Sequence, residues 1–349
     1  MSNKSTWVLT SLILGASVAL IGCGCNGSGG TNTDGSAAPT TTGGGKAPAP
    51  SKLSGKLNID GSTTVAPIIA LLSEDFKKDN PDVQQTVSKA GTGSGFKRFI
   101  AGEIDIATAS RAIKDDEAKS LAAKKIDFIE IPIAYDGVSI IVNPGNTWAT
   151  DISPAELKTA WNKDSKVTTW DQVNAKFPKE KITFYGPTDN HGTYEYFTEA
   201  INGKKNEIRK EYQANQEYTA IVSAVAGDKG GMAFVGYNYF ADNKDKVKAL
   251  TVNGIGPDEK TIADGTYKPL SRPLFIYVNK ASMAKPEVKA FVEFALGDKG
   301  KAAVTEAKYV LFDDALMANI KAYVAAGTTG TMMKDFKPGT KLSDVYAKK

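Results

Sequence analysis

From Leu57 onwards, short apolar runs alternate with stretches of helical periodicity, and this alternation limits the possible folds more than any other feature. The predicted strands are 57–60, 83–87 and 104–107, and the predicted helices are 65–78, a segment ending at 100, and 115–124. Chains that alternate in this way form α/β sheets, in which ligands bind beyond the carboxyl ends of the strands.

Two extended runs, 128–134 and 138–142, meet at Tyr135-Asp136-Gly137 and lead into a second series of the same kind. Its predicted helices are 154–161, 194–201 and 218–225, and its predicted strands are 182–185 and 232–235. A long extended run at 271–278 then precedes the predicted helices 286–294 and 300–307. We therefore expect two α/β lobes, each a mixed sheet flanked by helices, joined by extended hinge crossings near 135–143 and 270–278. Lobe I would comprise 55–135 plus 279–349, and lobe II 136–278.

The first 22 residues have the features of a signal peptide. Lys4 precedes an apolar run at 8–21, which is too short to span a membrane. The run ends in Leu20-Ile21-Gly22-Cys23, which resembles the lipobox of bacterial lipoproteins, so Cys23 is the expected lipidation site. Cys25 fits that pattern less well, and a Cys23–Cys25 pair used for a disulfide or a metal is the alternative. Residues 23–54 are rich in Gly, Ser, Thr, Ala and Pro and are expected to form a disordered, lipid-anchored linker.

Composition narrows the classes of function. The chain has 349 residues and a formal net charge of +4, and its Lys and Arg are scattered among nearly as many acidic residues. This distribution argues against nucleic-acid binding, which requires a concentrated basic face. The body carries one His and no Cys, so we expect no metal site and no cofactor.

Loops rich in Gly, Ser and Thr follow predicted strands and open predicted helices at 60–65, 91–96 and 189–194, and Ser110-Arg111 follows a third strand. Helix N-termini present unpaired N–H groups and a partial positive charge, so they attract oxyanions. Each loop taken alone is explained by helix capping, and Arg111 alone by a surface cation. Several such junctions should converge on one cleft, which favours an anion site. Asp136 and Asp189 are candidates to accept the proton of a hydrogen-bearing oxyanion, although Asp136 could instead cap a turn.

The order of motifs resembles the substrate-binding protein of the bacterial high-affinity phosphate transporter, in its longer lipoprotein branch. The matching stretches are 61–67, 91–97, 104–111, 132–137, 185–187, 192–200 and 264–273. The resemblance implies a two-lobed periplasmic-binding-protein fold of type II. It also implies binding of inorganic phosphate between the lobes and delivery to the permease subunits of an ABC importer. The implied phosphate ligands are Ser62, Thr63, Thr64, Gly93, Ser94, Gly95, Ser110, Arg111, Gly192 and Thr193.

One position departs from the family pattern. His191 stands where the family usually has Ser before the Gly192-Thr193 pair, so a hydroxyl contact is lost there and an imidazole contact is the new possibility. The implied protein is a monomer in the cell envelope, in the periplasm or on the outer face of the membrane. The alternatives are a receptor for another oxyanion, such as sulfate or molybdate, and a phosphatase. A phosphatase would require a nucleophile, metal ligands or an acid–base pair, which the residues do not suggest.

Overall fold

The computed structural model describes residues 53–189, 191–334 and 341–347. The predicted signal peptide, Cys23, Cys25 and the linker up to residue 52 lie outside these ranges, and the described residues belong to one compact unit. None of the helices in the described ranges is long and apolar enough to cross a membrane.

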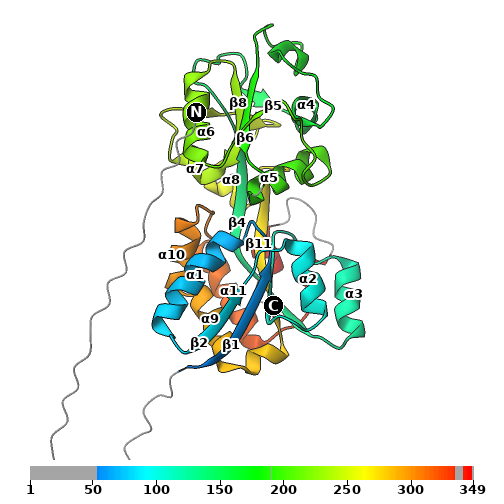
Figure 1. The fold of residues 1–349 in the computed structure, drawn as a ribbon, viewed down its shortest axis with the longest axis vertical. Helices are drawn as coiled ribbons and strands as arrows, with labels where there is room; N and C mark the ends of the chain where they lie inside the picture. The colour runs from blue at the N-terminus through cyan, green and yellow to red at the C-terminus, as the bar shows by residue number, and fades with distance from the viewer. Residues whose placement is uncertain (1–52, 190, 335–340, 348–349) are drawn as a thin grey trace, which may run out of the picture. The chain divides into compact units, whose positions relative to one another are not determined.

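Lobe I is built on a mixed sheet with the strand order β2-β1-β3-β11-β4 (Figure 1). Its strands are β1 (Gly55–Gly61), β2 (Val83–Val87), β3 (Ile106–Ala109), β11 (Ser271–Asn279) and the first part of β4 (Phe128–Val142). β2, β1 and β3 are parallel, and β11 is antiparallel to both β3 and β4. The helices of this lobe are α1 (Ala66–Asp79), α2 (Thr92–Ile100), α3 (Asp115–Ala123), α9 (Pro286–Ala295), α10 (Asp298–Glu306), α11 (Asp314–Ala326) and α12 (Leu342–Val345).

Lobe II continues the sheet from the far end of β4, which pairs antiparallel with β8 (Gly231–Gly236) and β9 (Lys248–Ala249). β6 (Thr183–Pro187) lies parallel to β8 and to β7 (Gln213–Asn215). The helices are α4 (Pro154–Trp161), α5 (Gly192–Phe197), a π-helical turn η2 (Thr198–Asn202), α6 (Tyr218–Gly227), α7 (Tyr237–Ala241) and α8 (Glu259–Ala263). The remaining short elements are β5 (Asp151–Ile152), β10 (Thr251–Val252), η1 (Trp170–Gln172) and η3 (Ala281–Ala284).

Strand β4 is continuous where the sequence predicted two runs meeting at residues 135–137. It is 15 residues long and buried throughout. Turn-forming residues do not interrupt it, because Asp136 lies opposite Arg272 of β11 and pairs with it, while Gly137 lies where a Cβ would come within 2.5 Å of Ile262. The two predicted runs are therefore one continuous strand, and the predicted α/β fold with two extended crossings, β4 and β11, is confirmed.

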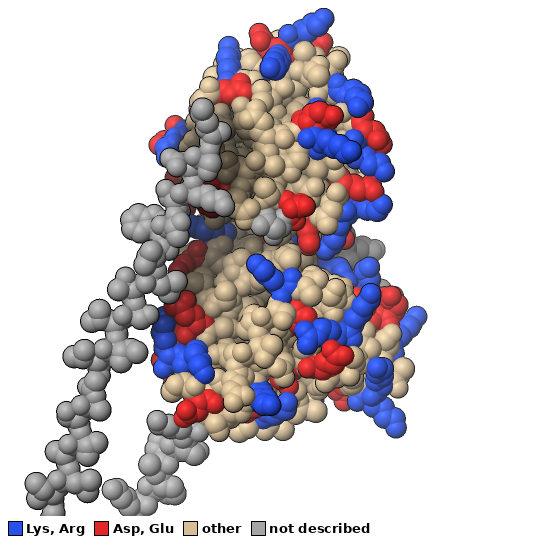
Figure 2. Space-filling view, in the orientation of Figure 1, with Lys and Arg blue, Asp and Glu red and all other residues tan. Residues whose placement is uncertain are grey.

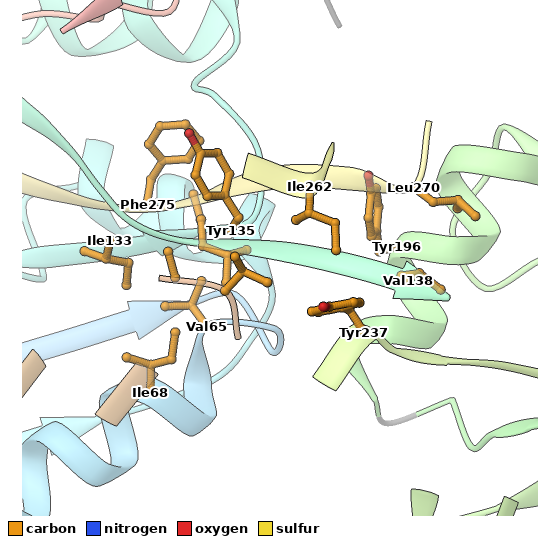
Figure 3. Packing of buried hydrophobic residues seen from close by; sticks show 14 of the residues in the cluster. Val65, Ile68, Ile133, Tyr135, Val138, Tyr196, Tyr237, Ile262, Leu270 and Phe275 are labelled. Atoms are coloured by element: carbon orange, nitrogen blue, oxygen red, sulfur yellow. The ribbon is translucent and has the colours of Figure 1, made fainter. Parts of the chain in front are cut away.

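Apolar side chains cover β4 along its length and join the cores of the two lobes. Helix α1 buries one stripe at helical spacing, from Ile68 to Phe76, against lobe I. In lobe II, the buried residues Leu270 and Ile262 lie next to Val138 and Gly137 of β4. Figure 3 shows these contributions along the strand, from Val65, Ile68, Ile133, Tyr135, Val138, Tyr196, Tyr237, Ile262, Leu270 and Phe275.

Candidate functional site

The loop between β1 and α1 places three hydroxyl residues at the start of a helix. The Ser62 side chain accepts hydrogen bonds from the backbone N–H groups of Thr64 (3.2 Å) and Val65 (3.4 Å), so its hydroxyl oxygen caps the turn. Thr63 donates to the Glu195 carboxylate of lobe II at 3.3 Å. Thr64 is buried, and its backbone carbonyl accepts a hydrogen bond from the Tyr309 hydroxyl at 2.7 Å.

The second loop opens helix α2 beside the first. Gly91 has φ +95°, a conformation that favours glycine, and Gly93 and Ser94 are exposed in the first turn. Gly95 lies so close to β1 that an added Cβ would come within 2.6 Å of the Gly61 Cα. Thr92 connects this loop to the third, because its Oγ1 accepts a hydrogen bond from the Ser110 N–H at 3.3 Å. The three loops of lobe I therefore form one cradle.

Arg111 is already paired within lobe I. Its two terminal nitrogens donate to the two carboxylate oxygens of Glu117, each at 2.8 Å, and its guanidinium lies 5.3 Å from the centre of the Phe96 ring. To bind an anion, this side chain would have to share its charge with Glu117.

Lobe II contributes the start of α5. Gly192 lies directly against Thr64, where a side chain on Gly192 would overlap the Thr64 Cα and hydroxyl. Thr193 is buried, and its side chain forms a hydrogen bond with the Tyr218 hydroxyl. Asp189, in the same loop, is exposed, and its charge acts on Tyr194 and Tyr212.

His191 lies edge-on to Tyr218, with ring centres 4.9 Å apart. Burial lowers the pKa of the imidazole, and a hydrogen bond with the Gln216 backbone opposes this effect. Its Nε2 atom is buried and has no hydrogen-bond partner among the residues that the structure describes. The ring is therefore neutral near pH 7, with one nitrogen free to accept a proton.

Arg272 of β11 is a site residue that the sequence did not single out. Its Nη2 donates to the Thr64 hydroxyl at 3.1 Å, and its Nε and Nη2 lie 3.3 Å from Asp136 Oδ2. The guanidinium also stacks on the ring of Tyr196, 3.7 Å from its centre. The only signal in the sequence was an arginine inside an otherwise apolar extended run.

Asp136 and Arg272 are both well buried, with side chains 2% and 11% exposed. Desolvation raises the pKa of the Asp136 carboxyl, and the neighbouring Arg272 charge opposes this rise. The pair thus places one cation and one hydrogen-bond acceptor beside Thr64, where the two lobes meet.

Two cavities lie beside this pair. The larger, of about 940 Å³, is lined by Thr63, Asp136, His191, Gly192 and Thr193 among others. The smaller, of about 250 Å³, is lined by Ser110, Arg111, Tyr196 and Arg272 among others. The remaining predicted residues line neither of these two cavities: Ser62, Thr64, Gly93, Ser94, Gly95 and Asp189.

The surface in Figure 2 is recessed between the lobes, and acidic and basic side chains are interspersed over the rest of this face. In the described ranges, no three His, Cys, Asp or Glu side chains gather as a metal would require. The donors around Thr64 are instead hydroxyls, helix-start amides and a guanidinium, which suit an oxyanion.

Comparisons with known proteins agree with this geometry. A family model described as a PBP superfamily domain matches residues 37–299. The phosphate-binding protein PstS of Staphylococcus aureus is 41% identical over 303 residues, which are 85% of each chain. Protein SphX of Synechococcus elongatus is 43% identical over 249 residues, 69% of this chain and 73% of SphX.

Among solved structures, a possible phosphate binding protein from Planctomyces limnophilus matches with a TM-score of 0.76 and 41% identity. The match covers 79% of this chain and 99% of that one. An ABC-type phosphate transport receptor from Vibrio cholerae shares the fold, with a TM-score of 0.61 and 24% identity over 73% of this chain and all of that one.

Proposed function

Because the chain belongs to the PstS family of phosphate-binding proteins within the PBP superfamily, we propose that it binds inorganic phosphate between its lobes and delivers it to an ABC import permease. The observation that carries this proposal is the meeting of Thr64, Arg272 and Asp136 at the point where Gly192 of lobe II contacts lobe I. Named relatives and a similar structure are described as phosphate-binding proteins, which supports the same ligand.

The chemistry of this group of residues suits a hydrogen phosphate ion. Hydrogen bonds from a guanidinium, hydroxyls and amides to a charged oxyanion are stronger than bonds between neutral groups, and they offset the cost of removing the ion from water. Asp136 adds an acceptor for the proton that phosphate still carries near neutral pH. Sulfate carries no proton there, so the same carboxylate repels it.

We assign the phosphate to the interlobe region with the ligands predicted from sequence, and we add Arg272. Thr63, Thr64, Gly192, Thr193 and Asp136 lie nearest to the contact between the lobes. The other proposed contributors are Ser62, Gly93, Ser94, Gly95, Ser110, Arg111, Asp189 and His191. The lobes are proposed to be 55–135 plus 279–349, and 136–278, with β11 crossing between them so that its residues 275–278 pair with β3 in the sheet of lobe I.

Isothermal titration calorimetry with phosphate, arsenate, sulfate and molybdate tests the ligand. We expect phosphate to bind most tightly, arsenate to follow because it shares the charge and the proton, and sulfate and molybdate to bind far more weakly. Tighter binding of sulfate or molybdate than of phosphate would overturn the assignment.

We further propose that the protein is a binding protein and not an enzyme, since the Staphylococcus aureus relative is named a phosphate-binding protein and the Planctomyces limnophilus structure a possible one. A steady-state assay with a chromogenic phosphate monoester checks this point. Turnover that depends on Arg272 or Asp136 would contradict it.

We also propose that the protein is a monomer held at the outer face of the cell envelope by a lipid on Cys23. The support is the sequence Leu20-Ile21-Gly22-Cys23 and the linker that follows it. Cys23→Ala should release the protein from membranes or block its processing, while Cys25→Ala should leave it anchored. Equal fractionation of the two variants would refute the anchor.

A further inference from the structure

Asp60 is a buried carboxylate at the end of β1, directly before the loop that carries Ser62, Thr63 and Thr64. Its side chain is 1% exposed and is held by three donors. Oδ1 accepts hydrogen bonds from the backbone N–H groups of Gly61 (2.8 Å) and Ala90 (3.0 Å). Oδ2 accepts from Nη1 of Arg98 at 2.8 Å.

These donors come from three segments that must be placed together for an anion to bind. Gly61 is the last residue of β1 and leads into the β1–α1 loop, Ala90 lies in the β2–α2 loop, and Arg98 lies on α2 itself. The two loops also share a backbone hydrogen bond from the Gly91 N–H to the Gly61 carbonyl, at 2.7 Å. One side chain therefore fixes the start of α1 relative to the start of α2.

We propose that Asp60 is a positioning residue for anion binding, which holds the two glycine- and hydroxyl-rich loops of lobe I in one arrangement before the ligand arrives. The inference rests on the proposed phosphate-binding function, since it concerns the same site. A site fixed in advance loses less conformational freedom on binding and therefore binds more tightly.

The electrostatics explain why Asp60 acts through the loops and not on the ligand. A free carboxylate near a bound anion would repel it, but Asp60 is buried and its charge is paired with Arg98. Both oxygens already accept from N–H donors and the side chain is only 1% exposed, so it acts on the loops that hold it.

Asp105 provides a matched control. It is also a buried carboxylate of lobe I with three donors: the Asn58 N–H (3.0 Å), the Ser282 hydroxyl (2.7 Å) and the Lys285 ammonium (2.8 Å). None of these donors belongs to the two loops. Loss of Asp105 should therefore cost stability without disturbing the cradle.

The experiment compares Asp60→Ala, Asp60→Asn and Asp105→Ala with the wild type. Phosphate dissociation constants are measured by calorimetry, stability by urea unfolding, and loop order by amide hydrogen exchange at Gly61 and Ala90. We expect Asp60→Ala to bind phosphate about tenfold more weakly or worse and to lose exchange protection at both amides. Asp60→Asn keeps an oxygen acceptor for both amides but loses the bond from Arg98, so it should weaken binding about two- to fivefold, less than Asp60→Ala.

Asp105→Ala should be destabilised yet bind phosphate within about twofold of the wild type, with Gly61 and Ala90 still protected. Equal affinity of Asp60→Ala and the wild type, or an equal loss of affinity in Asp105→Ala, would overturn the inference.

If Asp60→Ala does not fold, Arg98→Met replaces it, because the Arg98 side chain is 40% exposed and its loss should disturb folding less. Arg98→Met should weaken binding about two- to fivefold and speed exchange at Ala90, and unchanged values would again overturn the inference. A wild type that does not bind phosphate at all would instead refute the proposed function, and the inference with it.

Discussion

At the scale of single residues, the two arginines near the cleft, Arg111 and Arg272, differ in the residues that their guanidinium groups contact. The Arg111 guanidinium makes a two-pronged ion pair with Glu117, whereas Arg272 reaches Thr64 and lies between Asp136 and the ring of Tyr196. We expect Arg272→Ala to weaken phosphate binding by at least about 2 kcal/mol, because a buried anion would lose its cation. Arg111→Ala should cost about half as much, since Glu117 already offsets its charge. Calorimetry measures the phosphate affinity of both variants, and a larger loss of affinity in Arg111→Ala than in Arg272→Ala would contradict this ranking.

The choice between phosphate and sulfate should depend on Asp136. Its carboxyl is buried beside Arg272 and lines the larger cavity, so it can accept the phosphate proton. Asp136→Asn should therefore reduce the ratio of sulfate to phosphate dissociation constants by at least about tenfold. Asp189, the other candidate acceptor, is exposed and lines neither cavity, so Asp189→Asn should change the ratio less than Asp136→Asn does. An effect of Asp189→Asn alone would identify Asp189, and not Asp136, as the acceptor.

His191 should make phosphate binding depend on protons. Burial holds the pKa of the free imidazole below its ordinary value, so the ring is neutral at pH 7. A dianion bound nearby favours the imidazolium and raises that pKa, so binding should take up a fraction of a proton and strengthen as pH falls towards 6. Calorimetry in buffers of different ionisation enthalpy measures the uptake, with His191→Ser as control for the titration of phosphate itself. Identical slopes for the two proteins would place the ring away from the ligand.

The hydroxyl and glycine positions could be predicted because strand-to-helix junctions can be recognised from local sequence. Arg272 could not, because its role depends on a partner 136 residues away in the chain. Only the register of β11 against β4 places Arg272 opposite Asp136, and a single sequence does not contain that register. The pairing of Arg111 with Glu117 was equally hidden, although both residues lie in one short segment.

At the scale of secondary structure, the strongly periodic elements were predicted almost to their ends, as the 154–161 helix and the 83–87 strand show. Helix α11 was missed although it is 13 residues long, because its apolar stripe is narrow and buries only Leu316, Met317 and Ile320. The predicted runs 128–134 and 138–142 form one strand, because the ion pair between Asp136 and Arg272 holds the Asp136-Gly137 pair, a sequence that favours turns, in the extended conformation.

Adding one methyl group at Gly192 tests whether phosphate binding needs the contact between the start of α5 and the loop before α1. Gly192→Ala places a Cβ inside the volume of Thr64, so the start of α5 must move away from lobe I. We expect phosphate affinity to fall about tenfold or more, because amides of both lobes would no longer reach the same ion. Gly227→Ala, at the end of α6, meets open space and should leave affinity unchanged. Equal affinities for both variants would show that the contact is not needed for binding.

At the scale of the whole described unit, polar side chains of the two lobes contact each other at more than one place. Thr63 donates to Glu195 at 3.3 Å, and Lys308 pairs with Asp242 at 2.6 Å. The Lys308–Asp242 pair is largely exposed and contributes little, so the ligand should determine how far the lobes close. We expect the radius of gyration from X-ray scattering to fall when phosphate is added, and to fall less in Arg272→Ala at the same phosphate concentration. Superimposable profiles with and without phosphate would argue against closure.

The two strands that cross between the lobes are also hydrogen-bonded neighbours, with Ser271 opposite Gly137 at the crossing itself. Two separate connections could twist or slide independently, but a bonded pair bends as a single ribbon, most easily across its own plane. Relative motion of the lobes is thereby reduced to nearly one coordinate, an angle. A transport partner that contacts the outer ends of both lobes would then distinguish the phosphate-bound from the phosphate-free protein by that angle, without contacting the anion.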